Sequence, residues 1–433
     1  MFSVTMNEVS ADILVPIRTA VISEKYVDFP YSFIRRQLTM TETKTKHFPR
    51  SLDLFCGMGG LTLGFKRSGI QAIGGIDYCQ NAKQTFERNL SPLPCLVSDL
   101  TQTTVSEIEE FFKISAAEID IITGGAPCQG FSTVGKRDIT DPRNFLWRNF
   151  RDLVAEIRPA YVIIENVEGM LVMQGGKVRD SVIASFADIG YHMKCRLLKA
   201  ADYGVPQLRK RAFFIGWLDG LLPPEFPVPI SNYYLTVADA ISDLPPLTAG
   251  EICKSYQSMP QTDYQIARRK TANILLHHEA AKHSQKLIEI LKYIPDGGNR
   301  KSIPDRLQPA SGFHNSYARL ASNKPALAVT SNMRKPSSTR ATHPNQHRGL
   351  TVREGLRLQS FDDDFEVIGS RTSQYLQVGN AVPPLLGLAV GKEVVKAYQS
   401  HSDDEIARAR SQKVKSLNAN LKFPIQLALE ITV

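Results

Sequence analysis

Short apolar runs alternate with amphipathic segments through the middle of the chain. Between residues 51 and 217, runs of four or five mostly aliphatic residues predict strands, and the segments between them, such as 81–89 and 145–158, have helical periodicity. Strands that alternate with helices indicate a doubly wound α/β fold, in which helices cover both faces of a mostly parallel sheet. The predicted strands are 52–55, 72–76, 120–123, 161–164 and 212–216.

The pattern changes after residue 221. Prolines cluster between 223 and 229, and loops are predicted as far as 349, apart from a helical stretch at 279–293. Helical periodicity then returns, so we predict that the chain leaves the sheet domain and rejoins it. The predicted parts are an N-terminal extension and linker (1–50), the first part of the sheet domain (51–221), a smaller loop-rich domain (222–349), a return to the sheet domain (350–399) and a tail (400–433).

Length and composition favour a soluble protein of a reducing compartment. The 433 residues exceed one ordinary core, and 42% hydrophobic with 22% charged residues is typical of soluble globular chains. No apolar run is long enough to span a bilayer, and the N-terminus lacks the pattern of a secretory signal. The cysteines form no CxxC pair, which predicts neither a zinc site nor a disulfide framework and fits the cytoplasm.

The charge is unevenly distributed. The formal net charge is +9, and residues 306–353 contain no Asp or Glu. Because protein surfaces normally mix both signs, a stretch without acidic residues predicts a surface for a polyanion. Its basic residues are Arg306, Arg319, Lys324, Arg334, Lys335, Arg340, Arg348 and Arg353.

A glycine-rich turn, DLFCGMGG at 53–60, follows the first predicted strand. Doubly wound sheets bind nucleotides at such turns. The turn is not the dinucleotide fingerprint, because Thr62 occupies the sixth position of G-x-G-x-x-G, and no Lys-Ser/Thr pair follows it as in a P-loop. It therefore lets the backbone approach a ligand without forming a diphosphate cradle.

Polar side chains follow the second predicted strand, and a further one, Asp99, follows Val97. Asp77 is placed to accept hydrogen bonds from ribose hydroxyls, Tyr78 to lie against adenine, and Asp99 to bind the adenine amino group. An adenosine without a diphosphate indicates S-adenosylmethionine.

Three further segments carry candidate chemistry. GGAPCQGFS at 124–132 places Cys128 at the mouth of a strand-to-loop junction. Glu165 ends an apolar strand, where burial is expected to raise its pKa and favour a protonated form that donates a hydrogen bond. If QLRKR at 207–211 is a strand, Gln207, Arg209 and Arg211 point to one face.

The motifs of this chain, and the order in which they occur, resemble those of the C5-cytosine-specific DNA methyltransferases of bacterial restriction-modification systems. The resemblance extends from about residue 51 to 398. Three small departures from the family pattern are Cys56 for Ala, Ala126 for Pro or Phe, and Asp77 for Glu. The motifs are DLFCGMGG, DY at 77–78, SDL at 98–100, GGAPCQGFS, ENV at 165–167, QLRKR, LTVREGLRLQSF at 350–361 and QVGNAVP at 377–383.

The resemblance implies a mechanism. Cys128 attacks C6 of a flipped-out cytosine, and this makes C5 nucleophilic toward the methyl group of S-adenosylmethionine. Glu165 binds the N3 edge of the base, Asn166 fixes the loop that carries Glu165, Arg209 orients Glu165, and Arg211 contacts the substrate or its phosphate.

The resemblance also implies binding residues. Residues 222–349 correspond by position to the target-recognition domain. No metal is required, and the product is S-adenosylhomocysteine. The residues expected at the cofactor are Phe55, Gly57, Met58, Gly59, Gly60, Asp77, Tyr78, Asp99, Leu100, Pro127, Asn380 and Ala381. Those expected at DNA are Gln129, Ser132, Arg334, Lys335 and Arg340.

Other interpretations remain open. A transfer RNA methyltransferase of the same fold has a short recognition region, whereas the insert here is long. A non-catalytic DNA-binding regulator would be expected to have lost Cys128, Glu165 or the glycine turn, and a nicotinamide dehydrogenase is disfavoured by the failed fingerprint. His277, His278 and His283 have a spacing that looks like a metal site, but no Cys or acid pair lies near, so we interpret them as surface or interface residues.

The expected partner is double-stranded DNA in the bacterial cytoplasm. A restriction endonuclease that acts on the same site is compatible with the resemblance, without a stable complex. No membrane association is expected. One active site per chain makes a monomer sufficient.

Overall fold

The computed structural model describes residues 48–125, 146–230, 233–309 and 316–412. The described residues all belong to one unit, His47–Val433. Among them, no helix is both long enough and apolar enough to cross a membrane.

A seven-stranded sheet forms the framework, in the order β3-β2-β1-β4-β5-β7-β6. The neighbours from β3 to β5 are parallel, and β7 runs antiparallel to β5 and β6. The predicted α/β fold is confirmed. Sequence reasoning did not identify β3, which has three residues, or β6, whose charged residues hide its strand pattern. The strands are β1 (Arg50–Leu54), β2 (Gln71–Asp77), β3 (Cys95–Val97), β4 (Ile121–Gly124), β5 (Tyr161–Asn166), β6 (Tyr191–Lys199) and β7 (Lys210–Leu218).

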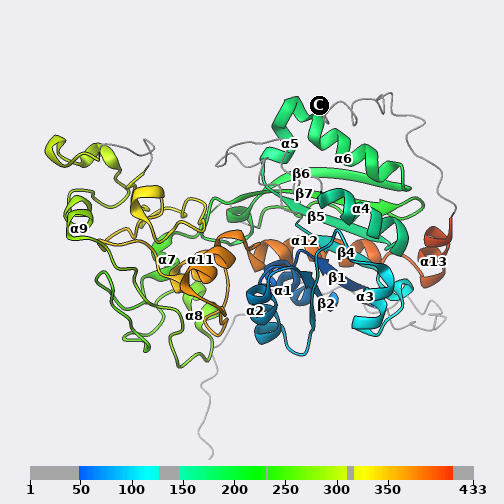
Figure 1. Ribbon diagram of the computed structural model, residues 1–433, viewed down its shortest axis with the longest axis horizontal. Helices are drawn as coiled ribbons and strands as arrows, with labels where there is room; N and C mark the ends of the chain where they lie inside the picture. The colour runs from blue at the N-terminus through cyan, green and yellow to red at the C-terminus, as the bar shows by residue number, and fades with distance from the viewer. Residues whose placement is uncertain (1–47, 126–145, 231–232, 310–315, 413–433) are drawn as a thin grey trace, which may run out of the picture. The chain divides into compact units, whose positions relative to one another are not determined.

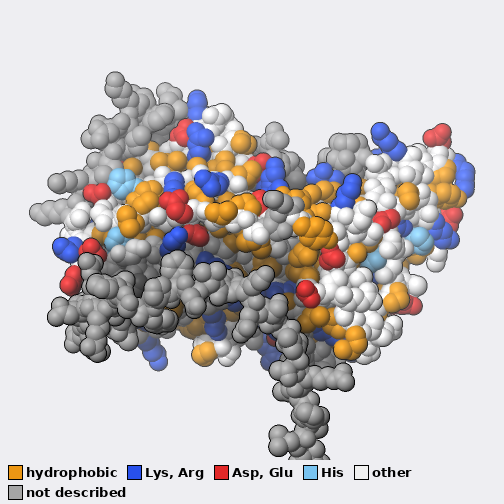
Figure 2. All heavy atoms as spheres, turned by 180° about the vertical axis from the view of Figure 1, so that it is seen from behind, with side chains coloured by type: hydrophobic (Ala, Val, Ile, Leu, Met, Phe, Trp, Pro, Cys, Tyr) orange, Lys and Arg blue, Asp and Glu red, His pale blue; other side chains and the backbone are white. Residues whose placement is uncertain are grey.

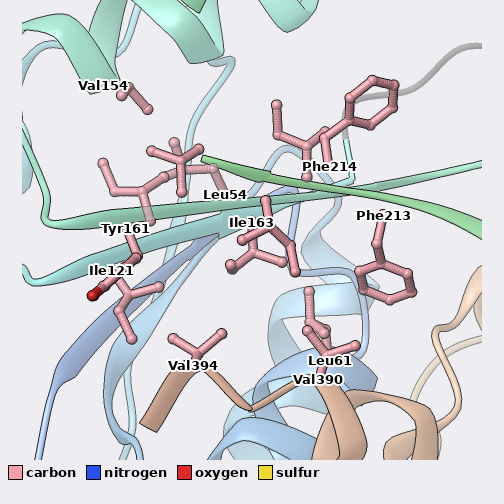
Figure 3. Close-up of a cluster of buried hydrophobic side chains, with 14 of the residues drawn as sticks. Leu54, Leu61, Ile121, Val154, Tyr161, Ile163, Phe213, Phe214, Val390 and Val394 are labelled. Carbon is pink, nitrogen blue, oxygen red and sulfur yellow. The ribbon is translucent and has the colours of Figure 1, made fainter. Parts of the chain in front are cut away.

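Helices cover both faces of the sheet (Figure 1). Val154 of α4 lies on one side, and Leu61 of α1 with Val390 and Val394 of α12 lies on the other (Figure 3). Apolar strand residues such as Ile163 are fully buried between these layers. The helices are α1 (Gly60–Arg67), α2 (Gln80–Leu90), α3 (Val105–Phe112), α4 (Leu146–Ile157), α5 (Gly169–Val172), α6 (Lys177–Ala187), α7 (Val237–Ile241), α8 (Asp263–Arg269), α9 (Gln285–Lys292), α10 (Val352–Leu358), α11 (Arg371–Asn380), α12 (Pro384–Tyr398) and α13 (Asp403–Ser411).

A second hydrophobic cluster lies in the loop-rich region. It joins buried residues of 237–341 to residues of α10 and α11, and Met58 of the glycine turn also packs into it. Helix α12 instead belongs to the cluster around the sheet. The segment after α10 already contacts the helices of the sheet domain, because Asp362 pairs with Arg67 of α1 and Glu366 pairs with Arg88 of α2.

Glycines allow α12 to approach α1 closely. A Cβ atom at Gly60 would lie 2.2 Å from the carbonyl oxygen of Val382, and one at Gly64 would lie 2.5 Å from the carbonyl oxygen of Pro384 and 2.6 Å from the amide nitrogen of Leu388. Both contacts are with backbone, which cannot rotate away. The segment from Val382 to Leu388 therefore packs against α1 at two positions where only glycine fits.

Buried arginines support the loop-rich region and α10. Arg357 pairs with Asp243 and Asp363, and Arg348 pairs with Glu354, all among buried side chains. The guanidinium of Arg348 holds the pKa of Glu354 well below its usual range, against the effect of burial.

We expect Gly64→Ala to destabilise the protein by about 1–3 kcal/mol, because the added methyl group overpacks a backbone contact. Alanine has the higher helix propensity, by up to about 1 kcal/mol, so propensity alone would change stability in the opposite direction. The free energy of unfolding in urea measures the effect. Lys66→Ala, at an exposed position of the same helix, serves as the control and should change stability by less than about 0.5 kcal/mol. A Gly64→Ala protein as stable as wild type would contradict the role given to this contact.

Candidate active site

The glycine turn and the end of β2 meet at the carboxyl edge of the sheet. The carboxylate of Asp77 accepts hydrogen bonds from the backbone N–H groups of Gly57 (2.9 Å) and Cys79 (2.8 Å). Burial raises the pKa of Asp77, and these hydrogen bonds oppose the rise. A carboxylate offers about four acceptor positions, so these backbone partners leave acceptor capacity for a ligand hydroxyl group. A Cβ atom at Gly57 would meet nothing within 4 Å, so the turn is open on this side.

Tyr78 and Asp99 follow the ends of the neighbouring strands β2 and β3. The Tyr78 side chain is 73% exposed. Asp99 is exposed as well, and its Oδ1 accepts a hydrogen bond from the N–H of Thr101 at 2.9 Å, which leaves Oδ2 for another donor. An accessible aromatic ring and two carboxylates therefore lie at one edge of the sheet.

Other residues predicted at the cofactor lie in different surroundings. The side chains of Met58, Leu100 and Ala381 are buried in hydrophobic clusters, so they contribute packing. Asn380 is exposed at the last position of α11. Phe55 is half-buried and has a φ of 65°, an uncommon conformation for a bulky residue at the start of the turn.

Glu165 and Arg211 form the ionic centre of the site. Arg211 Nε lies 2.6 Å from Glu165 Oε1, and Glu165 is buried. Burial raises the pKa of Glu165, while the charges of Arg211 and Arg209 act in the opposite direction. The effect of burial exceeds that of the two charges, so the net change in the pKa of Glu165 is a rise, which is the direction expected from the sequence. The Oδ1 of Asn166 accepts a hydrogen bond from the N–H of Val167 (2.8 Å), at the point where β5 ends.

The loop that carries the predicted nucleophile leaves the sheet beside Glu165. A Cβ atom at Gly124 would lie 2.2 Å from the carbonyl oxygen of Leu54, and one at Gly125 would lie 3.0 Å from Oε2 of Glu165. Both glycines therefore permit close approach, the second one directly to the carboxylate. The predicted residues Pro127, Cys128, Gln129 and Ser132 lie outside the described part of the chain.

The contact with Glu165 that we expected from Arg209 is made by Arg211. Arg209 is fully buried and donates to the carbonyl oxygens of Val329 and Gly379, each at 2.9 Å. The expectation assumed a strand over 207–211, but β7 begins at Lys210, so the strand alternation does not apply to Arg209. Arg209 instead joins the start of β7 to the end of α11.

Asp53 is a buried carboxylate to which sequence reasoning assigned no role. Thr62 donates a hydrogen bond to its Oδ2 at 2.5 Å. Burial raises the pKa of Asp53 to about 6, the bond from Thr62 opposes this, and the charges of Asp77 and Glu165 add to the rise. The sequence feature that could have identified it is an acidic residue inside the apolar run Leu52–Phe55, where a buried carboxylate is expected.

The residues predicted at DNA have mixed exposure. Lys335 and Arg340 are exposed, whereas Arg334 is half-buried, donates to Thr372 Oγ1 (3.2 Å) and lies over the ring of Tyr375. On the face drawn in Figure 2, basic and acidic side chains are interspersed.

The acid-free stretch is only partly a surface feature, which corrects its interpretation as a polyanion surface throughout. Arg319, Arg348 and Arg353 are buried. Arg319 donates to the carbonyl oxygens of Leu291 and Ile294, so its charge is used inside the protein. The sequence gives the number of these charges, but it does not show which of the arginine side chains are buried.

The histidines considered for a metal site are engaged in hydrogen bonds. His278 is buried between Thr351 Oγ1 and the carbonyl oxygen of Pro245, and His283 Nε2 accepts from the N–H of Gly349. Within the described ranges, no group of three or more His, Cys, Asp or Glu side chains is arranged to hold a metal ion.

Comparison with known proteins gives a consistent assignment. Residues 50–396 match the family described as C-5 cytosine-specific DNA methylase. Type II methyltransferase M1.HphI of Haemophilus parahaemolyticus is 39% identical over 348 residues, covering 80% of this chain and 86% of the relative. Type II methyltransferase M.DdeI of Desulfomicrobium norvegicum is 36% identical over 375 residues, covering 79% and 88%.

A solved structure supports the same assignment. A protein from E. coli, described as a DNA modification methyltransferase encoded within a prophage, has a TM-score of 0.66 and 26% identity to this chain. The likeness covers 81% of this chain and 99% of that one. The match of the family model and of these relatives over most of the length leads to one conclusion: the chain belongs to the C-5 cytosine-specific DNA methylase family.

Proposed function

We propose that this chain is a sequence-specific DNA (cytosine-5-)-methyltransferase of a type II restriction-modification system. Family membership and the names of its relatives support the reaction and its setting. The single observation that carries the chemistry is the buried Glu165 paired with Arg211, beside the glycine from which the Cys128 loop departs. A monomer acting in the bacterial cytoplasm is sufficient, and a separate restriction endonuclease would act on the same DNA site.

The proposed chemistry begins with the thiolate of Cys128. It forms a bond to C6 of an extruded cytosine, which breaks the conjugation of the ring and makes C5 an enamine carbon. Glu165 donates its proton to N3 as negative charge develops there, and its raised pKa keeps that proton available. C5 takes the methyl group as the bond between that group and the sulfur of the donor breaks, and N3 returns its proton to Glu165. C5 then loses its own proton to water, and the electron pair left behind forms the C5–C6 double bond and expels the thiolate of Cys128.

The arrangement at the sheet edge fits S-adenosylmethionine as methyl donor. Asp77 binds the ribose hydroxyls, Tyr78 lies against the adenine ring, and Asp99 accepts from the adenine amino group. When bound, the donor supplies an electrophilic methyl group. Within the described residues, the role of the protein is to orient this ligand next to the loop that starts at Gly125.

We expect Cys128→Ser to reduce methylation at least about a thousandfold, because a hydroxyl is a far weaker nucleophile than a thiolate. The wild type and the variant are expressed in a bacterial host without cytosine methylation, and genomic DNA is read by bisulfite sequencing. C5-methylation at one short motif, absent in the variant, is the expected result.

Cys195→Ser, at a half-buried position of β6, is the control for this experiment and should methylate like the wild type. If the Cys128→Ser variant methylates DNA at the wild-type rate, Cys128 is not the nucleophile. Soluble wild-type protein that labels transfer RNA and leaves DNA unmodified would overturn the proposed function.

Asp77→Ala is expected to weaken binding of S-adenosylhomocysteine by roughly ten- to hundredfold, since a hydrogen bond to a charged group contributes about 1.5–3 kcal/mol. Asp77→Asn, which keeps one acceptor for the backbone, should have an intermediate effect. Calorimetric titration measures the affinity, and thermal unfolding checks that both variants fold. Unchanged affinity in a folded Asp77→Ala protein would argue against this site.

Exchange of residues 222–349 with those of a relative is expected to transfer the methylated sequence of that relative. Because Leu356 and Leu358 of α10 pack in the same cluster as residues 237–341, a second chimera exchanges 222–361 to preserve this packing. Bisulfite sequencing identifies the motif. A folded, active chimera that keeps the original motif would place specificity elsewhere.

A further inference from the structure

A hollow of about 430 Å³ lies between the segment before α9, the segment after Met333 and the start of α11. Its apolar wall includes Leu287 of α9. None of the motifs considered for catalysis or donor binding contributes to it. The polar and charged residues that line it include Lys282, His283, Arg334, Lys335 and Arg371.

Most of the positive charge in this hollow is not balanced by acidic groups. Arg371 is paired with Glu279 (2.5 Å), so its charge is compensated. For Lys282 and Lys335, which are both exposed, no ion pair with a described residue occurs. The Arg334 guanidinium is held by Thr372 Oγ1 and the ring of Tyr375, neither of which is acidic.

His283 adds no charge near neutral pH. Its Nε2 accepts a hydrogen bond from the backbone N–H of Gly349, which requires a ring without a proton on that nitrogen. Burial, together with the charge of Arg348, lowers the pKa of His283. The hollow therefore presents two ammonium groups and one guanidinium that is held in place. These groups donate hydrogen bonds and carry positive charge, so the hollow is suited to an anion.

Helix α11 extends from this hollow to the segment that precedes β7. Arg371, its first residue, lines the hollow, and the carbonyl oxygen of Gly379, near its other end, accepts a hydrogen bond from Arg209. Ten helical residues span about 15 Å. This length corresponds to roughly four base-pair steps of a duplex at about 3.4 Å each.

We propose that this hollow, formed around Lys282, Arg334 and Lys335, binds a backbone phosphate of substrate DNA a few base pairs from the target cytosine. The inference rests on the proposed function and names a contact that the catalytic motifs do not provide. A phosphate carries a full negative charge and several acceptor oxygens, which matches the donors present. Bases also need acceptors from the protein for their amino groups, and the charged side chains here supply donors alone.

The test compares the full-length wild type with the double variant Lys282→Ala/Lys335→Ala. The affinity of each protein for a duplex that contains the motif found by bisulfite sequencing is measured over a range of salt concentrations. The double variant should bind about tenfold more weakly at moderate salt, and the slope of log K against log [salt] should become shallower by about 0.9 for each phosphate that the variant no longer neutralises. Lys301→Ala, at an exposed lysine outside the hollow, is the control and should match the wild type.

A second measurement locates the phosphate. Single phosphates of the duplex are replaced by uncharged methylphosphonates; the wild type should bind more weakly at one or two positions, and the double variant should be insensitive there. Affinity and slope equal to those of Lys301→Ala would overturn the inference. A change in the methylated motif would also overturn it, because the hollow would then read bases. If the proposed function itself is wrong, the wild type methylates no DNA, and this result separates that failure from a failure of the phosphate site alone.

Discussion

The structure depends on the close contact between α1 and α12. The chain leaves the sheet after β7, its buried apolar residues between 237 and 381 pack largely in another cluster, and α12 then packs in the cluster around the sheet. Gly60 and Gly64 let the backbone of α12 and the segment before it lie directly against α1, where any side chain would meet a carbonyl oxygen. This contact completes one face of the sheet. It also brings Asn380 and Ala381 toward the glycine turn, since Val382, which touches Gly60, follows them directly.

The loop-rich region is held by arginines where other proteins use regular secondary structure. Buried backbone carbonyls need donors, and a region with few helices and strands leaves many of them unsatisfied. Arg353 donates to the carbonyl oxygens of Leu276, Asp362 and Phe365, and Arg319 has a similar set of backbone partners. A guanidinium provides five donors in a fixed plane, so a single side chain satisfies several loop segments together.

The same residues link this region to the chemistry. Arg209 donates to Val329 and Gly379, so the strand that carries Arg211 is joined both to the loop-rich region and to α11. Arg211 in turn contacts Glu165. Three carboxylic acids, Asp53, Asp77 and Glu165, lie near enough to influence one another, because the charges of Asp77 and Glu165 both raise the pKa of Asp53. The two arginines counter part of this accumulation of negative charge at Glu165.

The sequence by itself determined the fold class and the identity of most candidate residues. Apolar runs that alternate with helical periodicity specify a parallel sheet. Residues that follow parallel strands gather at one edge, which is why the sequence made Asp77 and Glu165 candidates. Side-chain partners were decided by the tertiary structure alone. Arg209 and Arg211 are two residues apart and chemically identical, but Arg209 precedes the strand and is buried against distant carbonyl groups. Arg319 and Lys335 lie in one acid-free stretch, yet one is interior and the other exposed. Such differences arise from contacts between segments more than 20 residues apart, and no local pattern of residues encodes them.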